Sequence, residues 1–113
     1  MANAFKNKKV DLTTTDATTL YTVPTATTAV IKSILVSDDS GSGDTITITL
    51  TNASSAVFSL FKVKAISANT TSELLTEPLV AEESEIIKVT AATADRLHVV
   101  MSVMEVTPRE VTT

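Results

Sequence analysis

Large aliphatic residues alternate strictly with threonine between Thr45 and Thr51. A period of two is typical of a β-strand with one buried side and one side that faces water. We therefore predict that Ile46, Ile48 and Leu50 point into a hydrophobic core.

The rest of the chain repeats this pattern of short β-branched runs between polar turn formers, and no capped amphipathic helix of normal length is apparent. The predicted strands are 8–12, 18–23, 28–37, 45–52, 56–66, 73–75 with 79–80, 85–90 and 97–107. Seven or eight strands with short connections predict an all-β protein, a single antiparallel β-sandwich with jelly-roll-like topology.

The sandwich domain is predicted to span residues 10–107, with a basic N-terminal arm at 1–9 and a C-terminal tail at 108–113. Pro108 follows the last predicted strand, and proline interrupts the pairing of a sheet because it has no N–H to donate. No internal repeat and no second domain boundary is visible.

Two predicted strands carry apolar residues on both faces. In 97–107 the odd-numbered positions from Leu97 to Val103 are apolar, but Val100 and Met104 on the other face are apolar too. In 56–66, Phe58 lies on the face opposite Phe61. Two interpretations stay open: such a strand is central and covered by two layers, or one face contacts another subunit. Under the second, Phe58, Val100 and Met104 are candidate partner-binding residues.

Composition narrows the class of protein. A chain of 113 residues fits one domain, and the absence of cysteine excludes disulfides and thiolate metal sites. The net charge of −4 and the aromatic content of 4% argue against nucleic-acid binding, which needs a surplus of cations or aromatic platforms for bases. No apolar run is long enough for a bilayer or a secretory signal, so we expect synthesis in the cytoplasm and no membrane contact.

Charge is segregated along the chain. The first nine residues contain three lysines and no acid, whereas the stretch 73–85 contains five glutamates and no base. One interpretation is two ordinary solvated segments. The other is that the basic arm lies on an acidic surface of a neighbouring copy or of a shell protein. The candidate residues for that contact are Lys6, Lys8, Lys9, Glu73, Glu77, Glu82 and Glu83.

Candidate catalytic chemistry is sparse, and no cofactor is predicted. His98 is the only histidine and lies within a predicted strand, which favours a packed or interfacial role. Gly41 and Gly43 are the only glycines, so neither a phosphate-binding loop nor a nucleophile elbow is possible. The loop 38–44 holds three aspartates that offer oxygen ligands to Ca²⁺, but their spacing is not that of an EF-hand. We interpret it as a charged turn.

The segment Thr19-Leu-Tyr-Thr-Val-Pro24, followed by Thr28-Ala-Val-Ile-Lys-Ser-Ile-Leu-Val36 and the alternating strand 45–51, resembles small structural proteins of marine tailed bacteriophages. The resemblance covers about the first half of the chain. It implies a virion protein present in many copies, a decoration or cement protein that binds the major capsid protein, and a homo-oligomer, either trimer or dimer.

Two alternatives remain beside the decoration protein. One is an accessory protein of the neck, tail or fibre base of the virion, where it would contact other virion proteins. The other is a receptor- or glycan-binding module, which the small number of aromatic residues disfavours. An enzyme is the least favoured class.

Overall fold

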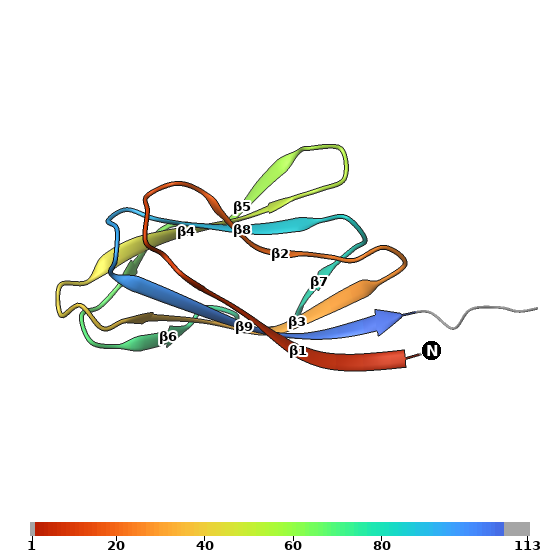
Figure 1. Ribbon diagram of the computed structural model, residues 1–113, viewed down its shortest axis with the longest axis horizontal. Coiled ribbons are helices and arrows are strands. Elements are labelled where there is room, and N and C mark those ends of the chain that lie inside the picture. Colours follow the sequence, from red (N-terminus) through yellow and green to blue (C-terminus); the bar gives the residue numbers. More distant parts are fainter. Residues whose placement is uncertain (1, 108–113) are drawn as a thin grey trace, which may run out of the picture.

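The computed structural model describes residues 2–107 and confirms an all-β protein (Figure 1). The strands are β1 (Ala2–Asp11), β2 (Thr18–Thr22), β3 (Thr28–Asp38), β4 (Asp44–Thr51), β5 (Val57–Ile66), β6 (Thr71–Glu73), β7 (Leu79–Ala81), β8 (Ile86–Ala91) and β9 (Leu97–Thr107). Over this described range the chain has no helix, and so none long and apolar enough to cross a membrane. The predicted tail 108–113 lies outside the described residues.

Two antiparallel sheets pack face to face as a sandwich. Sheet A has the order β1-β9-β3-β6, with β7 also paired to β3, and sheet B has the order β2-β8-β4-β5. If β6 and β7 are taken as one interrupted strand, the strand orders of the two sheets are those of a jelly roll, in which only β4 and β5 are consecutive strands of one sheet. The predicted topology is therefore confirmed. The structure has nine strands where seven or eight were predicted, because the interrupted strand forms two separate pieces.

The core lies between the sheets and follows the predicted alternation. Ile46 and Ile48 of β4 are fully buried, and Leu50 is 8% exposed. In β9, the odd-numbered residues from Leu97 to Val103 are buried, whereas the even-numbered residues face away from the core. β9 is central in sheet A, between β1 and β3, yet within the described chain only its inner face is covered.

The expectation of a separate basic arm is corrected for residues 2–9. They belong to β1, which pairs with β9 through ten residues in continuous antiparallel register. β1 begins earlier than the predicted strand 8–12 because β9 is long and offers backbone partners as far as Thr107. A polar segment can join a sheet in this way since main-chain hydrogen bonds do not depend on side-chain type.

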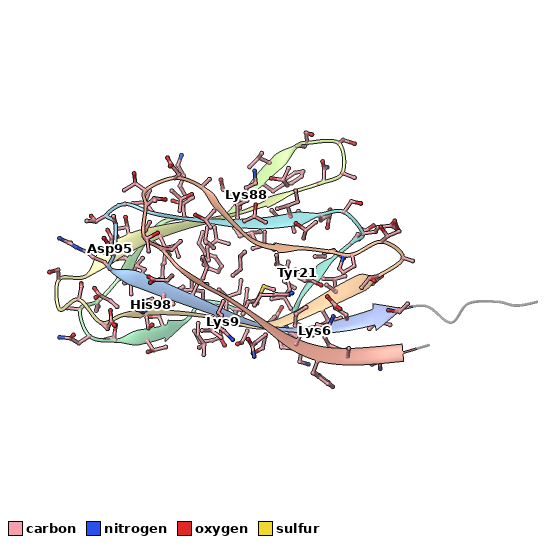
Figure 2. The ribbon with its side chains drawn as sticks, viewed as in Figure 1. Lys6, Lys9, Tyr21, Lys88, Asp95 and His98 are labelled. Carbon is pink, nitrogen blue, oxygen red and sulfur yellow. The ribbon has the colours of Figure 1, made fainter. Side chains whose placement is uncertain are left out.

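A buried polar network joins β1 to both sheets. The Glu105 side chain of β9 is 9% exposed, and it accepts a hydrogen bond from the Tyr21 hydroxyl of β2 at 2.6 Å. The Lys6 ammonium of β1 forms an ion pair with the other carboxylate oxygen at 2.9 Å. The Lys8 ammonium lies 5.9 Å from the centre of the Tyr21 ring, within the range of a cation–π contact. Figure 2 shows Tyr21 between the two sheets.

These contacts shift the ionisation of both acidic groups. The hydrogen bond from Tyr21, and next that from Lys6, hold the pKa of the Glu105 carboxyl below its ordinary value of 4.5. Burial, reinforced by the bond to Glu105, raises the pKa of Tyr21 above its usual range. The charged carboxylate and the neutral phenol are thus the forms that the fold favours.

The network predicts an acid-sensitive contribution to stability. Because the folded pKa of Glu105 lies below its unfolded value, the contribution is complete above about pH 4.5 and is lost as the pH falls through the folded pKa. Glu105→Gln is expected to lower the free energy of unfolding by about 1 to 3 kcal/mol at neutral pH, because Lys6 and Tyr21 lose a charged acceptor. Urea unfolding at neutral and acid pH measures both effects. Glu77→Gln, at an exposed position, is the control, and equal losses in the two variants would contradict the assignment.

Candidate interaction surface

The outer face of sheet A is apolar along one row that crosses four strands. Phe5 of β1 pairs with Met104 of β9, Met104 pairs with Val30 of β3, and Val30 pairs with Val80 of β7. All four side chains face away from the core, and Phe5 and Val80 are 76% and 57% exposed. We call these four residues the apolar row. Cross-strand neighbours on one face touch, so the row forms a continuous stripe.

A second row on the same face is apolar in the middle and charged at both ends. Lys9 of β1 pairs with Val100 of β9, Val100 with Leu35 of β3, and Leu35 with Glu73 of β6. Val100 is 37% exposed and Leu35 is partly exposed. We call these four residues the charged-end row. The structure thus brings Val100 and Met104, both predicted partner-binding residues, onto one surface.

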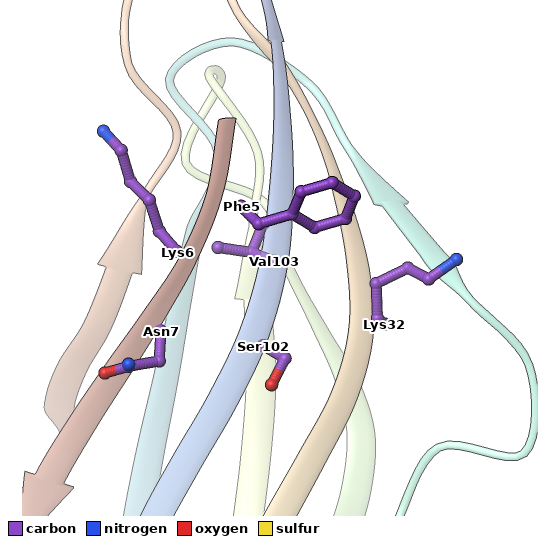
Figure 3. A pocket seen from close by; sticks show the side chains of 6 residues that line it. All are labelled: Phe5, Lys6, Asn7, Lys32, Ser102 and Val103. Atoms are coloured by element: carbon purple, nitrogen blue, oxygen red, sulfur yellow. The ribbon is translucent and has the colours of Figure 1, made fainter. Parts of the chain in front are cut away.

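A shallow hollow of about 370 Å³ lies beside Phe5, between the two rows. Asn7, Lys32 and Ser102 line it together with Phe5 (Figure 3). The Phe5 ring extends across β9 toward β3, whereas the Lys6 side chain points the other way. Lys32 follows the buried Ile31 and faces outward, at the point where the register of β3 with β9 shifts between Ile31 and Ser33.

The predicted acidic residues lie along the edge of sheet A opposite β1. Glu73 ends β6, Glu77 lies between β6 and β7, and Glu82 and Glu83 follow β7. The Glu73 carboxylate accepts hydrogen bonds from the Ile34 amide at 2.8 Å and the Leu75 amide at 3.2 Å, where strand pairing to β3 is interrupted. The basic and acidic segments are therefore on opposite edges of the same sheet, too far apart to pair within one chain.

The β5 edge, formed by the exposed residues Val57, Phe58 and Val63, is a second apolar surface. β5 pairs only with β4, so the interpretation of 56–66 as a central strand covered by two layers is wrong. Val57, Phe58 and Val63 are 61%, 53% and 61% exposed. Figure 1 shows β5 on the side of the sandwich opposite to sheet A.

β5 is irregular at the centre of this edge. Its pairing register with β4 shifts at two places. The first lies between Ile46 and Ile48 of β4, and the second lies between Ile48 and Thr49. Val63 has a positive φ of 52°, and its amide donates to the Thr47 hydroxyl at 3.0 Å. Bulges discourage uncontrolled edge-to-edge pairing. A β-branched residue in the left-handed region is strained, and strained residues concentrate at functional sites.

The three aspartates of the loop 38–44 do not converge. Asp38 accepts hydrogen bonds from the Ser40 amide and hydroxyl, which hold the pKa of its carboxyl below the ordinary value. Asp44 accepts from the Thr93 amide at 2.9 Å, while Asp39 faces His98. Within residues 2–107 no three acidic or histidine side chains gather as metal ligands. The geometry matches a charged turn.

His98 lies on the outer face of sheet A beside two carboxylates. Its Nε2 is 3.2 Å from Asp11, and its Nδ1 is 3.8 Å from Asp39. Ser37 is its cross-strand neighbour on β3, but both ring nitrogens face aspartates, so neither is directed at that hydroxyl. In this arrangement His98 is an ion-pair partner of Asp11 and Asp39 when it is protonated.

Sequence reasoning missed most of the surface residues. Phe5, Val30, Val80, Val57 and Val63 were not candidates, because their neighbours on other strands depend on register. An aromatic residue within the polar segment 1–9 was the one available signal, and it pointed to Phe5. No protein-family model matches the chain, and no curated protein resembles it significantly.

The strain at Val63 can be measured. Val63→Gly is expected to leave the free energy of unfolding unchanged or to raise it by up to about 1 kcal/mol, because relief of the left-handed conformation offsets the entropy of glycine. Val57→Gly, on the same strand without a positive φ, is the control and should lower it by about 0.5 to 1 kcal/mol. Urea unfolding measures both variants, and an equal fall in the free energy of unfolding would contradict the backbone strain assigned to Val63.

Proposed function

We propose that the chain is a structural protein of a bacteriophage virion, and that it binds the outside of the assembled head shell as a decoration protein. The β5 edge carries this proposal. β5 is the edge strand of sheet B and leaves Phe58 and Val57 exposed at consecutive positions, Phe58 beside the core-facing Leu50 of β4 and Val57 on the opposite face. Large exposed apolar side chains that gather at one place indicate a protein contact.

The scaffold supports the same function. The segments that resemble phage virion proteins, Thr19–Pro24 and Thr28–Val36, lie in and around β2 and β3 and supply core residues such as Leu20, Ile31 and Ile34. The resemblance therefore concerns the sandwich that supports the surface. A rigid sandwich with an apolar edge is suited to bridging shell subunits.

Binding to the assembled shell stabilises it by mass action. A ligand that binds the assembled state, and not the separated subunits, shifts the equilibrium toward assembly by an amount set by its concentration and dissociation constant. The major capsid protein is then the partner, and the virion is the location of the protein after synthesis in the host cytoplasm.

Particle composition and heat resistance test this function. Particles from the phage that encodes the chain should contain it at a copy number of the same order as the major capsid protein, and particles lacking it should release DNA at a lower temperature. Quantitative mass spectrometry and a thermal release assay measure these quantities. A copy number of about three to twelve, as expected for a ring at the neck or tail, would instead favour the accessory protein.

Phe58 is expected to contribute much of the binding energy. Phe58→Ser should weaken binding to shells that lack the protein by about tenfold or more, because a half-buried aromatic ring is commonly an interface hot spot. Ser59→Ala, at the neighbouring exposed position of the same strand, is the control and should bind like the wild type. A co-sedimentation titration gives the dissociation constants. If Phe58→Ser binds the shells as tightly as the wild type does, the β5 edge is not the contact surface.

A further inference from the structure

The outer face of sheet A has complementary features at its two edges. The apolar row begins at β1 with Phe5 and ends at β7 with Val80, and the charged-end row begins with Lys9 and ends with Glu73. We propose that this face binds a second copy of the same chain. The two sheets A pack face to face about a two-fold axis that runs parallel to the strands, between β9 and β3.

The position of the axis determines which residues meet. A two-fold axis parallel to the strands reverses the left-to-right order of the strands in the second copy. It leaves positions along the strand direction unchanged, so each row lies over the same row of the second copy. Phe5 then lies opposite Val80 of the second copy, and Met104 lies opposite its Val30. The apolar row packs on itself, which removes the exposed Phe5 ring from water.

Charge complementarity selects this axis. In the charged-end row, Lys9 lies opposite Glu73 of the second copy, and Val100 lies opposite its Leu35. The two-fold axis perpendicular to the strands would instead place the basic β1 edges over each other and the acidic β6 edges over each other. Like charges in register are repulsive, so the parallel axis is favoured. The arrangement also brings each basic segment to an acidic segment, which a single chain cannot do.

The face is large enough for a dimer. Three strands of ten or eleven residues, with β6 and β7 in line beside them, give at a spacing of about 4.8 Å a surface of roughly 19 by 33 Å, or roughly 600 Å² in projection. A standard interface buries about 800 Å² of accessible surface from each partner, and side chains add to the projected area. The hollow beside Phe5 lies between the rows, and the Asn7 and Ser102 side chains that line it can bind bridging water. The stem of Lys32 there is long enough to carry its ammonium toward the rim.

This inference does not depend on the virion assignment, and the isolated protein tests it. Sedimentation velocity over a range of concentrations should show a dimer. Lys9→Glu should raise the dissociation constant of the dimer by about tenfold or more, because the reversed charge occurs twice in a symmetric dimer. Lys88→Glu makes the same change of charge on sheet B, on the other side of the molecule, and should leave the dimer unchanged (Figure 2).

Two variants that each replace an exposed phenylalanine test the same face. Phe5→Ser should weaken the dimer, whereas Phe58→Ser, at the β5 edge, should not. Both positions are more than half exposed, so neither change is expected to unfold the domain. A wild-type protein that stays monomeric at every concentration would overturn the proposal. So would a dimer that Lys9→Glu and Phe5→Ser both leave intact.

Cross-linking tests the axis directly, since the chain has no cysteine of its own. In the double variant Phe5→Cys with Val80→Cys, a short thiol cross-linker should join two copies, because the two positions in one chain are three strands, roughly 14 Å, apart. The double variant Phe5→Cys with Phe58→Cys should not form this product. Absence of the covalent dimer in the first variant, with dimer present by sedimentation, would overturn the proposed axis.

Discussion

A two-layer sandwich covers only one face of each sheet, and this constraint shapes the rest of the molecule. Side chains alternate along a regular strand, so residues of one parity enter the core and residues of the other parity are left outside. In β9 the odd-numbered residues are buried, and the even-numbered residues Val100 and Met104 are partly exposed. An apolar residue at an even position of β9 therefore contacts solvent or another molecule.

The buried carboxylate of Glu105 determines which residues share the outer face with β9. Its contacts with Tyr21 and Lys6 hold β1 at the margin of the sandwich, with Lys6 and Lys8 directed inward. A buried charge is tolerated when it is paired and fully hydrogen-bonded. Once the even-numbered residues of β1 face inward, Phe5 and Lys9 must face outward. An interior network thus sets the composition of an exterior surface.

The two apolar surfaces differ in the way they are built. The outer face of sheet A has two rows that cross the sheet in register, with opposite charges at the ends of one row and one irregularity of β3 between the rows. The β5 edge is bulged and strained at Val63, with apolar side chains exposed beside lysines. A face whose rows run in register across the sheet suits symmetric packing, whereas a bulged edge suits contact with a differently shaped partner. Because they lie on opposite sides, one molecule can use both.

The sequence by itself determined the fold class, the strands beyond residue 9 and inward-facing residues such as Ile46, Ile48 and Leu50, because the period-two alternation is local and needs no help from other strands. Tertiary structure decided which strands are neighbours. Phe5, Met104, Val30 and Val80 form a row only when four strands distant in sequence pair in one register, and a shift of one residue would turn any of them into the core. Register arises from the pairing of whole strands, so no local pattern encodes it. The same reason explains why residues 2–9, polar and basic, became a strand: the long strand β9 offered unpaired backbone partners that composition does not reveal.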